Sequence, residues 1–124
     1  MSKDETTYNR VSDYSLFHRE LGSGYYAIDV DWVEYRAGRG IVALICVTGN
    51  IEDKFRIHDI KKIVWGRTEF ERKVINMIAD KLEVPAYYVV HDTALTVFHV
   101  HNIKNLKEFK VMTEEDYKKF IKNL

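Results

Sequence analysis

The sequence has one cysteine, one proline and no glutamine, and its 19 basic and 19 acidic side chains balance. A single cysteine cannot form a disulfide within the chain, which indicates a reducing, cytoplasmic location. No apolar run reaches the roughly 20 residues of a membrane-spanning helix, and the polar N-terminus lacks the apolar core of a secretion signal. We therefore expect no membrane partner. A net charge of zero also argues against a protein that coats nucleic acid non-specifically.

The remaining composition is that of a globular protein. Hydrophobic residues make up 46% of the chain and charged residues 31%. A length of 124 residues predicts a single domain, 1–124, in which the polar residues 1–10 are expected to be frayed. Abundant Lys, Glu and Ile beside the missing Gln are typical of a thermophilic source.

Hydrophobic periodicity predicts alternating helices and strands. Thr68 and Glu71 have the spacing of a helix capping box, and Thr113 can cap a last amphipathic helix. The expected elements are a helix at 13–21, strands at 25–36, 41–47 and 54–58, a helix at 68–82, strands at 86–91 and 95–101, and a helix after 113. This order predicts an α/β fold, a small sandwich with a mixed sheet.

Residues 25–48 are the most informative segment, and they read YYAIDVDWVEYRAGRGIVALICVT. Two apolar strand-like runs flank a turn at Gly38 and Gly40, and acids cluster in the first run. The segment resembles the core of the PD-(D/E)xK nuclease superfamily. In that family an Asp opens one strand, and the next strand ends in an acid, any residue and Lys. Asp31 matches the first position, whereas Cys46 and Thr48 stand at the acid and Lys positions.

The resemblance covers about residues 12–101 and implies a restriction-endonuclease-like core, a mixed central sheet flanked by helices. It also implies that acids hold Mg²⁺ while a Lys positions the attacking water. Glu20 resembles the additional helix-borne acid of Holliday-junction resolvases. The catalytic positions implied are Glu20, Asp29, Asp31, Cys46 and Thr48, with Asp31, Asp29 and Glu20 as metal ligands. Near Glu20, the side chains of Arg10, His18 and Arg19 are candidates for contacts with nucleic-acid phosphates.

The chain departs from the family at two positions. The thiol of Cys46 is soft and mostly protonated, so it contributes little to Mg²⁺ binding, and Thr48 has no charge. In the family the acid or the Lys can move to another element. Glu34 is a candidate for the moved acid, although its strand parity relative to Asp31 is wrong without a bulge. Candidates for the moved base are Lys54, Lys61 and Lys62.

Each candidate also has an ordinary structural interpretation. Asp29 and Asp31 fit a solvated strand end, Glu20 fits an exposed helix face, and Cys46 fits a small apolar residue of a central strand. His18 and its basic neighbours likewise fit an exposed helix face. His99 and His101 share one strand face, which is a zinc-ligand spacing, but the sequence places no third ligand beside them.

The first hypothesis is a nuclease-fold protein with a degenerate metal site, associated with DNA and cleaving it weakly or not at all. One alternative is an active Mg²⁺-dependent DNA endonuclease or junction resolvase that uses Glu20, Asp29, Asp31 and a moved Lys. Another is a non-enzymatic interaction module, for example a viral or mobile-element accessory protein. The expected partner is DNA, Mg²⁺ is expected only for an active enzyme, and a homodimer is left open. Fold likeness alone does not choose among these.

Overall fold

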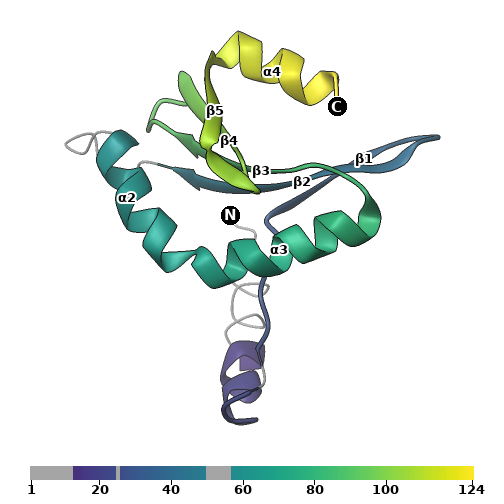
Figure 1. Cartoon of the computed structure of the whole chain (residues 1–124), viewed down its shortest axis with the longest axis vertical. Coiled ribbons are helices and arrows are strands. Elements are labelled where there is room, and N and C mark those ends of the chain that lie inside the picture. The colour runs from purple at the N-terminus through teal and green to yellow at the C-terminus, as the bar shows by residue number, and fades with distance from the viewer. Residues whose placement is uncertain (1–12, 25, 50–56) are drawn as a thin grey trace.

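The computed structural model describes residues 13–24, 26–49 and 57–124. They form a mixed α/β fold around one five-stranded sheet with strand order β1-β2-β3-β4-β5 (Figure 1). A short helix at 13–19 is followed by β1 (Trp32–Arg36), β2 (Gly40–Gly49), α2 (Ile57–Arg67), α3 (Glu69–Leu82), β3 (Ala86–His91), β4 (Val97–Asn102), β5 (Asn105–Thr113) and α4 (Glu114–Lys122). No helix in these ranges is long and apolar enough to cross a membrane.

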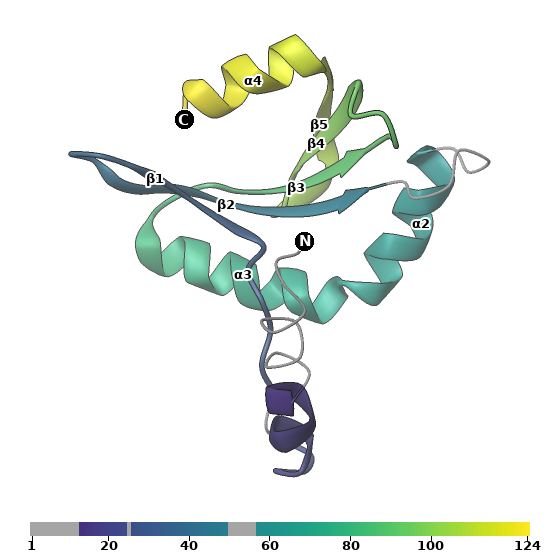
Figure 2. The same cartoon turned by 180° about the vertical axis from the view of Figure 1, so that it is seen from behind.

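The sheet is mixed because one of its connections is a helical crossover. β1 and β2 form an antiparallel hairpin, β2 and β3 are parallel, and β3, β4 and β5 are antiparallel. Parallel neighbours require a long connection, which α2 and α3 provide across one face of the sheet. Helix α4 covers the opposite face, as the two views show (Figures 1 and 2).

Strand β2 is buried on both faces, as its continuous apolar sequence predicts. Leu44 and Cys46 belong to the core beneath α2 and α3. Ile45 points the other way and packs in the core beneath α4. Strand β3 alternates in the same manner, so the two cores are separated only by the thickness of the sheet.

Several predicted elements are confirmed. Strand β3 has the predicted bounds, and the β1–β2 hairpin turns at Gly38 and Gly40, both with positive φ. The hydroxyl oxygen of Thr113 accepts a hydrogen bond from the backbone N–H of Asp116 at 3.1 Å, so the predicted cap of α4 is present. The predicted inward face of α4 packs on the sheet through Tyr117, Phe120, Ile121 and Leu124.

Other expectations need correction. The first strand is confined to Trp32–Arg36 instead of starting at residue 25. Of the strand expected at 54–58, residues 57 and 58 are the start of α2, and 54–56 lie outside the described residues. The capping box at Thr68 is wrong, because its hydroxyl donates to the carbonyl of Val64 at 2.8 Å instead of capping α3. Strand β5 was not expected, because its Lys and Glu residues interrupt the apolar pattern of this edge strand.

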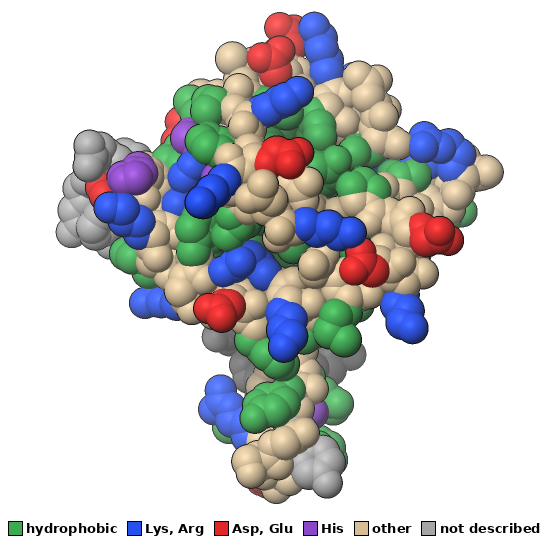
Figure 3. Space-filling view, in the orientation of Figure 1, with side chains coloured by type: hydrophobic (Ala, Val, Ile, Leu, Met, Phe, Trp, Pro, Cys, Tyr) green, Lys and Arg blue, Asp and Glu red, His purple; other side chains and the backbone are tan. Residues whose placement is uncertain are grey.

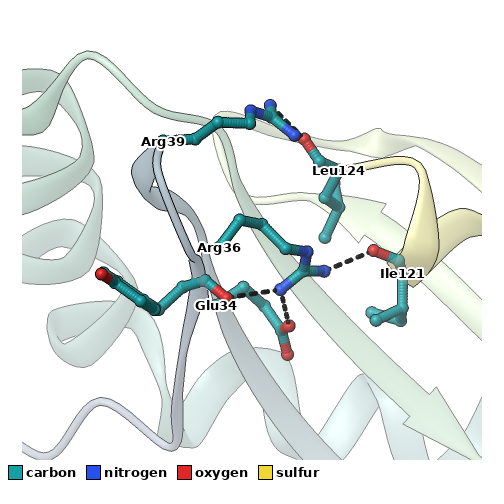
Figure 4. Close-up of polar contacts among 6 residues, drawn as sticks. Glu34, Arg36, Arg39, Ile121 and Leu124 are labelled. Atoms are coloured by element: carbon teal, nitrogen blue, oxygen red, sulfur yellow. Dashed lines mark hydrogen bonds and ion pairs between the residues drawn. The ribbon is translucent and has the colours of Figure 1, made fainter.

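Two arginines of the hairpin hold the C-terminal end of α4 (Figure 4). Arg36 donates from Nη2 to the carbonyl of Ile121 at 2.5 Å and forms an ion pair with Glu34 at 3.0 Å. Arg39 donates to the carbonyl oxygen of Leu124 at 2.8 Å. The last carbonyls of a helix have no partner within the helix and carry partial negative charge, so guanidinium groups stabilise this end.

Candidate functional site

Asp31 lies beside the strand that carries the two departures from the nuclease pattern. The pairing of Trp32 with Ile45 places Asp31 opposite Cys46, one residue before β1 begins. One carboxylate oxygen of Asp31 accepts a hydrogen bond from the backbone N–H of Val47 at 2.9 Å. The prediction that Asp31 and Cys46 lie on adjacent strands of one antiparallel hairpin is therefore confirmed for Cys46, whereas Asp31 lies opposite it just before its strand begins.

A second acid approaches from α3. Burial, followed by the negative charges of Asp31 and Asp29, raises the pKa of the Glu71 carboxyl above its usual value. Arg72 partly offsets this effect. The sequence pattern had assigned Glu71 to a capping box, so its place near the aspartates was missed. Its closeness to Asp31 depends on how α3 packs against the hairpin. The local sequence around Glu71 does not predict this packing.

Cys46 lies within the electrostatic influence of both acids and is neutral. Burial raises the pKa of its thiol to about 12, and the charges of Asp31 and Glu71 add to the increase. A thiol that keeps its proton is a poor ligand for a hard cation such as Mg²⁺. The position at which the resemblance implies an acid is therefore uncharged in this chain.

Thr48 makes a neutral hydrogen bond where the resemblance implies a Lys. Its hydroxyl oxygen lies 2.7 Å from the hydroxyl oxygen of Tyr88 on the parallel strand β3. Burial raises the pKa of the Tyr88 hydroxyl, so this group also stays protonated. The pair satisfies both hydroxyls without introducing a charge.

The remaining predicted site residues do not join this cluster. Glu20 directly follows the helix at 13–19, which both views place away from β1 and β2 (Figures 1 and 2). His18 and Arg19 lie on the same projecting helix, and Arg10 is outside the described residues. Within the described ranges, no group of three or more His, Cys, Asp or Glu side chains is arranged to hold a metal ion.

The candidates for a moved acid and a moved base lie at different places in the fold. Glu34 pairs with Arg36, and its charge contributes to the raised pKa of Tyr117 on α4, so it lies on the face opposite Cys46. The parity argument against Glu34 is thus confirmed. Lys62 is exposed, and Lys54 lies outside the described residues. Of the two described candidates, Lys61 is the buried one, and it lies on the same side of the sheet as Cys46.

Lys61 is enclosed by two histidines and an aromatic ring. Its side-chain nitrogen lies 3.0 Å from Nδ1 of His99 and 3.1 Å from Nε2 of His101. It also lies 4.1 Å from the centre of the Phe109 ring, which stacks on His101. Only 8% of Lys61 is exposed. We call these four residues the lysine cage.

The hydrogen bonds of the lysine cage fix its protonation. The carbonyl of Leu106 lies 2.7 Å from Nδ1 of His101 and can only accept, so Nδ1 carries the proton and Nε2 accepts from Lys61. Burial lowers the pKa of Lys61, and as long as this group is an ammonium it has no lone pair, so Nδ1 of His99 accepts as well. Burial, followed by the Lys61 charge, lowers the pKa of His99, and burial is the largest cause that lowers the pKa of His101 to about 4.

The two histidines share a strand face, as their alternation with Phe98 and Val100 predicts. In the part of the chain that the structure describes, no third metal ligand joins these two histidines. The imidazole nitrogens that face the cage interior both bond to the side-chain nitrogen of Lys61. The lone pairs of these two nitrogens, which a metal ion would need, are therefore used to bind the side-chain nitrogen of Lys61.

Trp65 joins the two clusters across the α2 side of the sheet. Its ring meets Tyr88 edge-on at 5.2 Å and His101 edge-on at 4.9 Å. Arg72 donates to the Trp65 carbonyl at 2.6 Å, which ties α3 to α2. A continuous layer of polar and aromatic groups therefore runs from Thr48 to the lysine cage, with carboxylates at one end and the cation at the other.

No protein-family model, curated protein or solved structure matches this chain. What the protein does must therefore be argued from its own residues and their arrangement.

Proposed function

We propose that the protein is a nuclease-fold, DNA-associated protein whose metal site is degenerate, so that it cleaves phosphodiesters weakly or not at all. The observation that carries the proposal is the hydrogen bond between Asp31 and the backbone N–H of Val47. This hydrogen bond holds Asp31, the first acid of the resemblance, beside β2. The second acid and the Lys of the resemblance would both lie on β2. At those two positions the chain has a protonated thiol and a neutral hydroxyl.

The order and pairing of the elements support the fold part of the proposal. An antiparallel hairpin is followed by a helical crossover and a strand parallel to β2. The acid and Lys positions of the resemblance then fall near the carboxyl end of β2, next to β3. Ligands commonly bind at the carboxyl ends of parallel strands, where side chains from several elements meet.

The chemistry of the cluster supports weak or absent cleavage. Mg²⁺ binds oxygen ligands, and phosphodiester cleavage uses the metal to offset the charge that develops on phosphate. Asp31, Asp29 and Glu71 interact electrostatically. Among the groups that set the pKa of Glu71, Arg72 is the cation, and its effect is smaller than those of burial and of the two aspartates. Lys61, the buried base on this side, is held by His99 and His101 instead.

The charge distribution agrees with selective rather than general DNA binding. On the face in Figure 3, histidine and basic side chains gather where α2 meets β4 and β5, whereas acidic and basic groups alternate elsewhere. A face on which basic and acidic side chains are interspersed, on a chain with no net charge, gains little from non-specific phosphate contacts. We therefore expect preference for a particular DNA structure over plain duplex.

The test combines DNA binding, metal binding and cleavage. Fluorescence anisotropy with duplex, single-stranded and four-way-junction DNA measures binding at low and physiological salt. Line broadening by Mn²⁺ reports metal binding, and plasmid nicking reports cleavage. We expect DNA binding without efficient nicking, and weak Mn²⁺ broadening that Asp31→Asn abolishes. Asp80→Asn is the matched control, because Asp80 is an exposed acid on α3 whose carboxylate forms an ion pair with Lys104 at 2.6 Å.

Two results would contradict the proposal. Efficient Mg²⁺-dependent cleavage that Asp31→Asn abolishes would establish the active-enzyme alternative. Absence of binding to every DNA form would favour the non-enzymatic interaction module.

A further inference from the structure

The residues before β1 form an N-terminal arm that projects from the body of the protein. We define the arm as residues 13–24 and 26–30, the helix at 13–19 and the extended segment that leads to Asp31. Both views show this helix beyond α3, away from the sheet (Figures 1 and 2). Ile28 and Val30 of the extended segment pack against the core, whereas the helix at 13–19 leaves Tyr14 and Phe17 exposed and gains little tertiary packing.

The arm nevertheless carries an apolar stripe. Tyr14, Phe17 and Leu21 follow helical spacing, and they are 62%, 58% and 49% exposed. Tyr14 and Phe17 contact each other, with ring centres 6.0 Å apart. An isolated helix of two turns is not stable in water, because nucleation is costly and few hydrogen bonds follow it. The stripe therefore needs a surface to pack against.

Helix α3 offers such a surface. Its buried side chains Ile75 and Ala79 face the sheet, whereas Phe70 and Met77 are 49% and 60% exposed. Phe70 and Met77 are seven residues apart, two turns on one side of the helix. The base of the arm already contacts this surface, since the rings of Tyr26 and Phe70 lie 5.3 Å apart.

We propose that two copies of this chain exchange their arms, so that the helix at 13–19 of each copy packs on Phe70 and Met77 of its partner. One sequence supplies both the projecting stripe and the acceptor surface, and such a contact repeated by a two-fold axis closes at a dimer. Gly22 and Gly24 have φ of +93° and +91°. Glycine adopts this left-handed conformation without steric cost, so the loop can change the direction of the chain after the helix.

The size and charge of the contact fit a dimer. Three arm side chains and two α3 side chains per copy would each bury roughly 100 Å², which gives about 1,000 Å² in total, the smallest area expected of a specific interface. The chain has no net charge, so two copies do not repel each other at long range. The inference does not depend on the proposed DNA-associated function.

Sedimentation velocity of the full chain over a range of concentrations tests the exchange. We expect a dimer for the parent and at least a tenfold weaker dimer for Phe17→Ser and, separately, for Met77→Ser. Val111→Ser is the matched control, because Val111 is also 60% exposed but lies on β5, the strand at the far edge of the sheet from β1. Circular dichroism checks that each variant is folded. If a serine variant is unfolded, the dimer of Met77→Lys is measured in its place.

A crosslink gives a second, independent readout. With Ser15→Cys on the arm and Lys73→Cys on α3, a bismaleimide should join two chains, and diluting the protein should reduce this product. A parent that is monomeric at every concentration would overturn the proposal. So would a dimer that Phe17→Ser and Met77→Ser leave unchanged, or a crosslink formed only within one chain.

Discussion

The side-chain nitrogen of Lys61 lies 3.1 Å from Nε2 of His101, while Nδ1 of the same ring lies 2.7 Å from the carbonyl of Leu106. Both ring nitrogens are therefore used, one as donor and one as acceptor. This arrangement requires His101 to be neutral, because a protonated ring would direct an N–H at an ammonium group. The hydrogen bond that joins Lys61 of α2 to His101 of β4 therefore requires a neutral imidazole.

We predict that stability falls as the pH is lowered from about 6.5 to about 4. The pKa of His101 is lowered from 6.5 to about 4, first by burial and then by the charges of Lys61 and His99, against the raising effect of the Leu106 hydrogen bond. In that window the unfolded state binds the proton and the folded state does not, so acid favours unfolding. Above 6.5 the contribution is complete. Urea unfolding across this range measures it.

The control for this prediction is His58→Gln, since His58 is exposed on α2. It should leave the pH dependence unchanged, whereas His101→Phe should flatten it between pH 6.5 and 4. Equal slopes for His101→Phe and the parent would mean that other groups cause the acid sensitivity.

We predict that Lys61→Met raises the pKa of both His99 and His101. The positive charge of Lys61 contributes to lowering both pKa values, and methionine fills similar space without charge. An NMR titration of the histidine ring protons measures the two pKa values directly. Lys62→Met, which removes an exposed charge one residue along, should change them much less. If Lys61→Met lowers either pKa, the assigned direction of the hydrogen bonds is wrong.

We predict that Arg36→Ala lowers the free energy of unfolding by about 1–3 kcal/mol, the range for losing a charge-assisted hydrogen bond to a partly buried group. The change removes the donor to the Ile121 carbonyl and leaves Glu34 unpaired. Arg39→Ala, whose hydrogen bond to Leu124 is exposed, should cost less. Urea unfolding gives both values, and faster amide exchange in α4 should accompany the first. Equal, negligible effects would show that the hairpin does not hold α4.

The sequence could predict those parts of the fold in which local pattern and tertiary packing agree. Strand β3 and the Thr113 cap of α4 follow from apolar runs and a capping hydroxyl. The shared face of His99 and His101 follows from strand alternation. Strand β5 escaped prediction because Lys107, Glu108 and Lys110 interrupt its apolar residues, as suits an edge strand.

The candidate site was predictable only in part, for a similar reason. Asp31 and Cys46 belong to one hairpin, so their pairing follows from the turn between them. Glu71 comes near Asp31 from α3, a helix that follows the hairpin in the sequence. Lys61 and His99 are 38 residues apart in the sequence but lie in contact. Such contacts depend on how α2 and α3 cross the sheet. Glu20 illustrates the reverse case, because its helix precedes the site in sequence but projects from it in space.

The central claim is that Asp31 stands in a nuclease-like site that lacks an acid at Cys46 and a cation at Thr48. The double variant Cys46→Glu with Thr48→Lys supplies both groups. Cys46 is fully buried, so the new carboxylate should destabilise the protein until a divalent cation binds. Circular dichroism with and without Mg²⁺ therefore accompanies every assay. The triple variant that adds Asp31→Asn is the control for the site.

The most direct measurement is the rate of Mg²⁺-dependent cleavage by this double variant on plasmid, duplex and branched DNA. Loss of one electrostatic group commonly lowers an enzymatic rate by about 10²–10³-fold, so restoring two should raise cleavage at least about a hundredfold over the parent. Asp31→Asn should remove the gain. A folded double variant that binds Mg²⁺ no better and cleaves none of these DNAs faster than the parent would contradict the account.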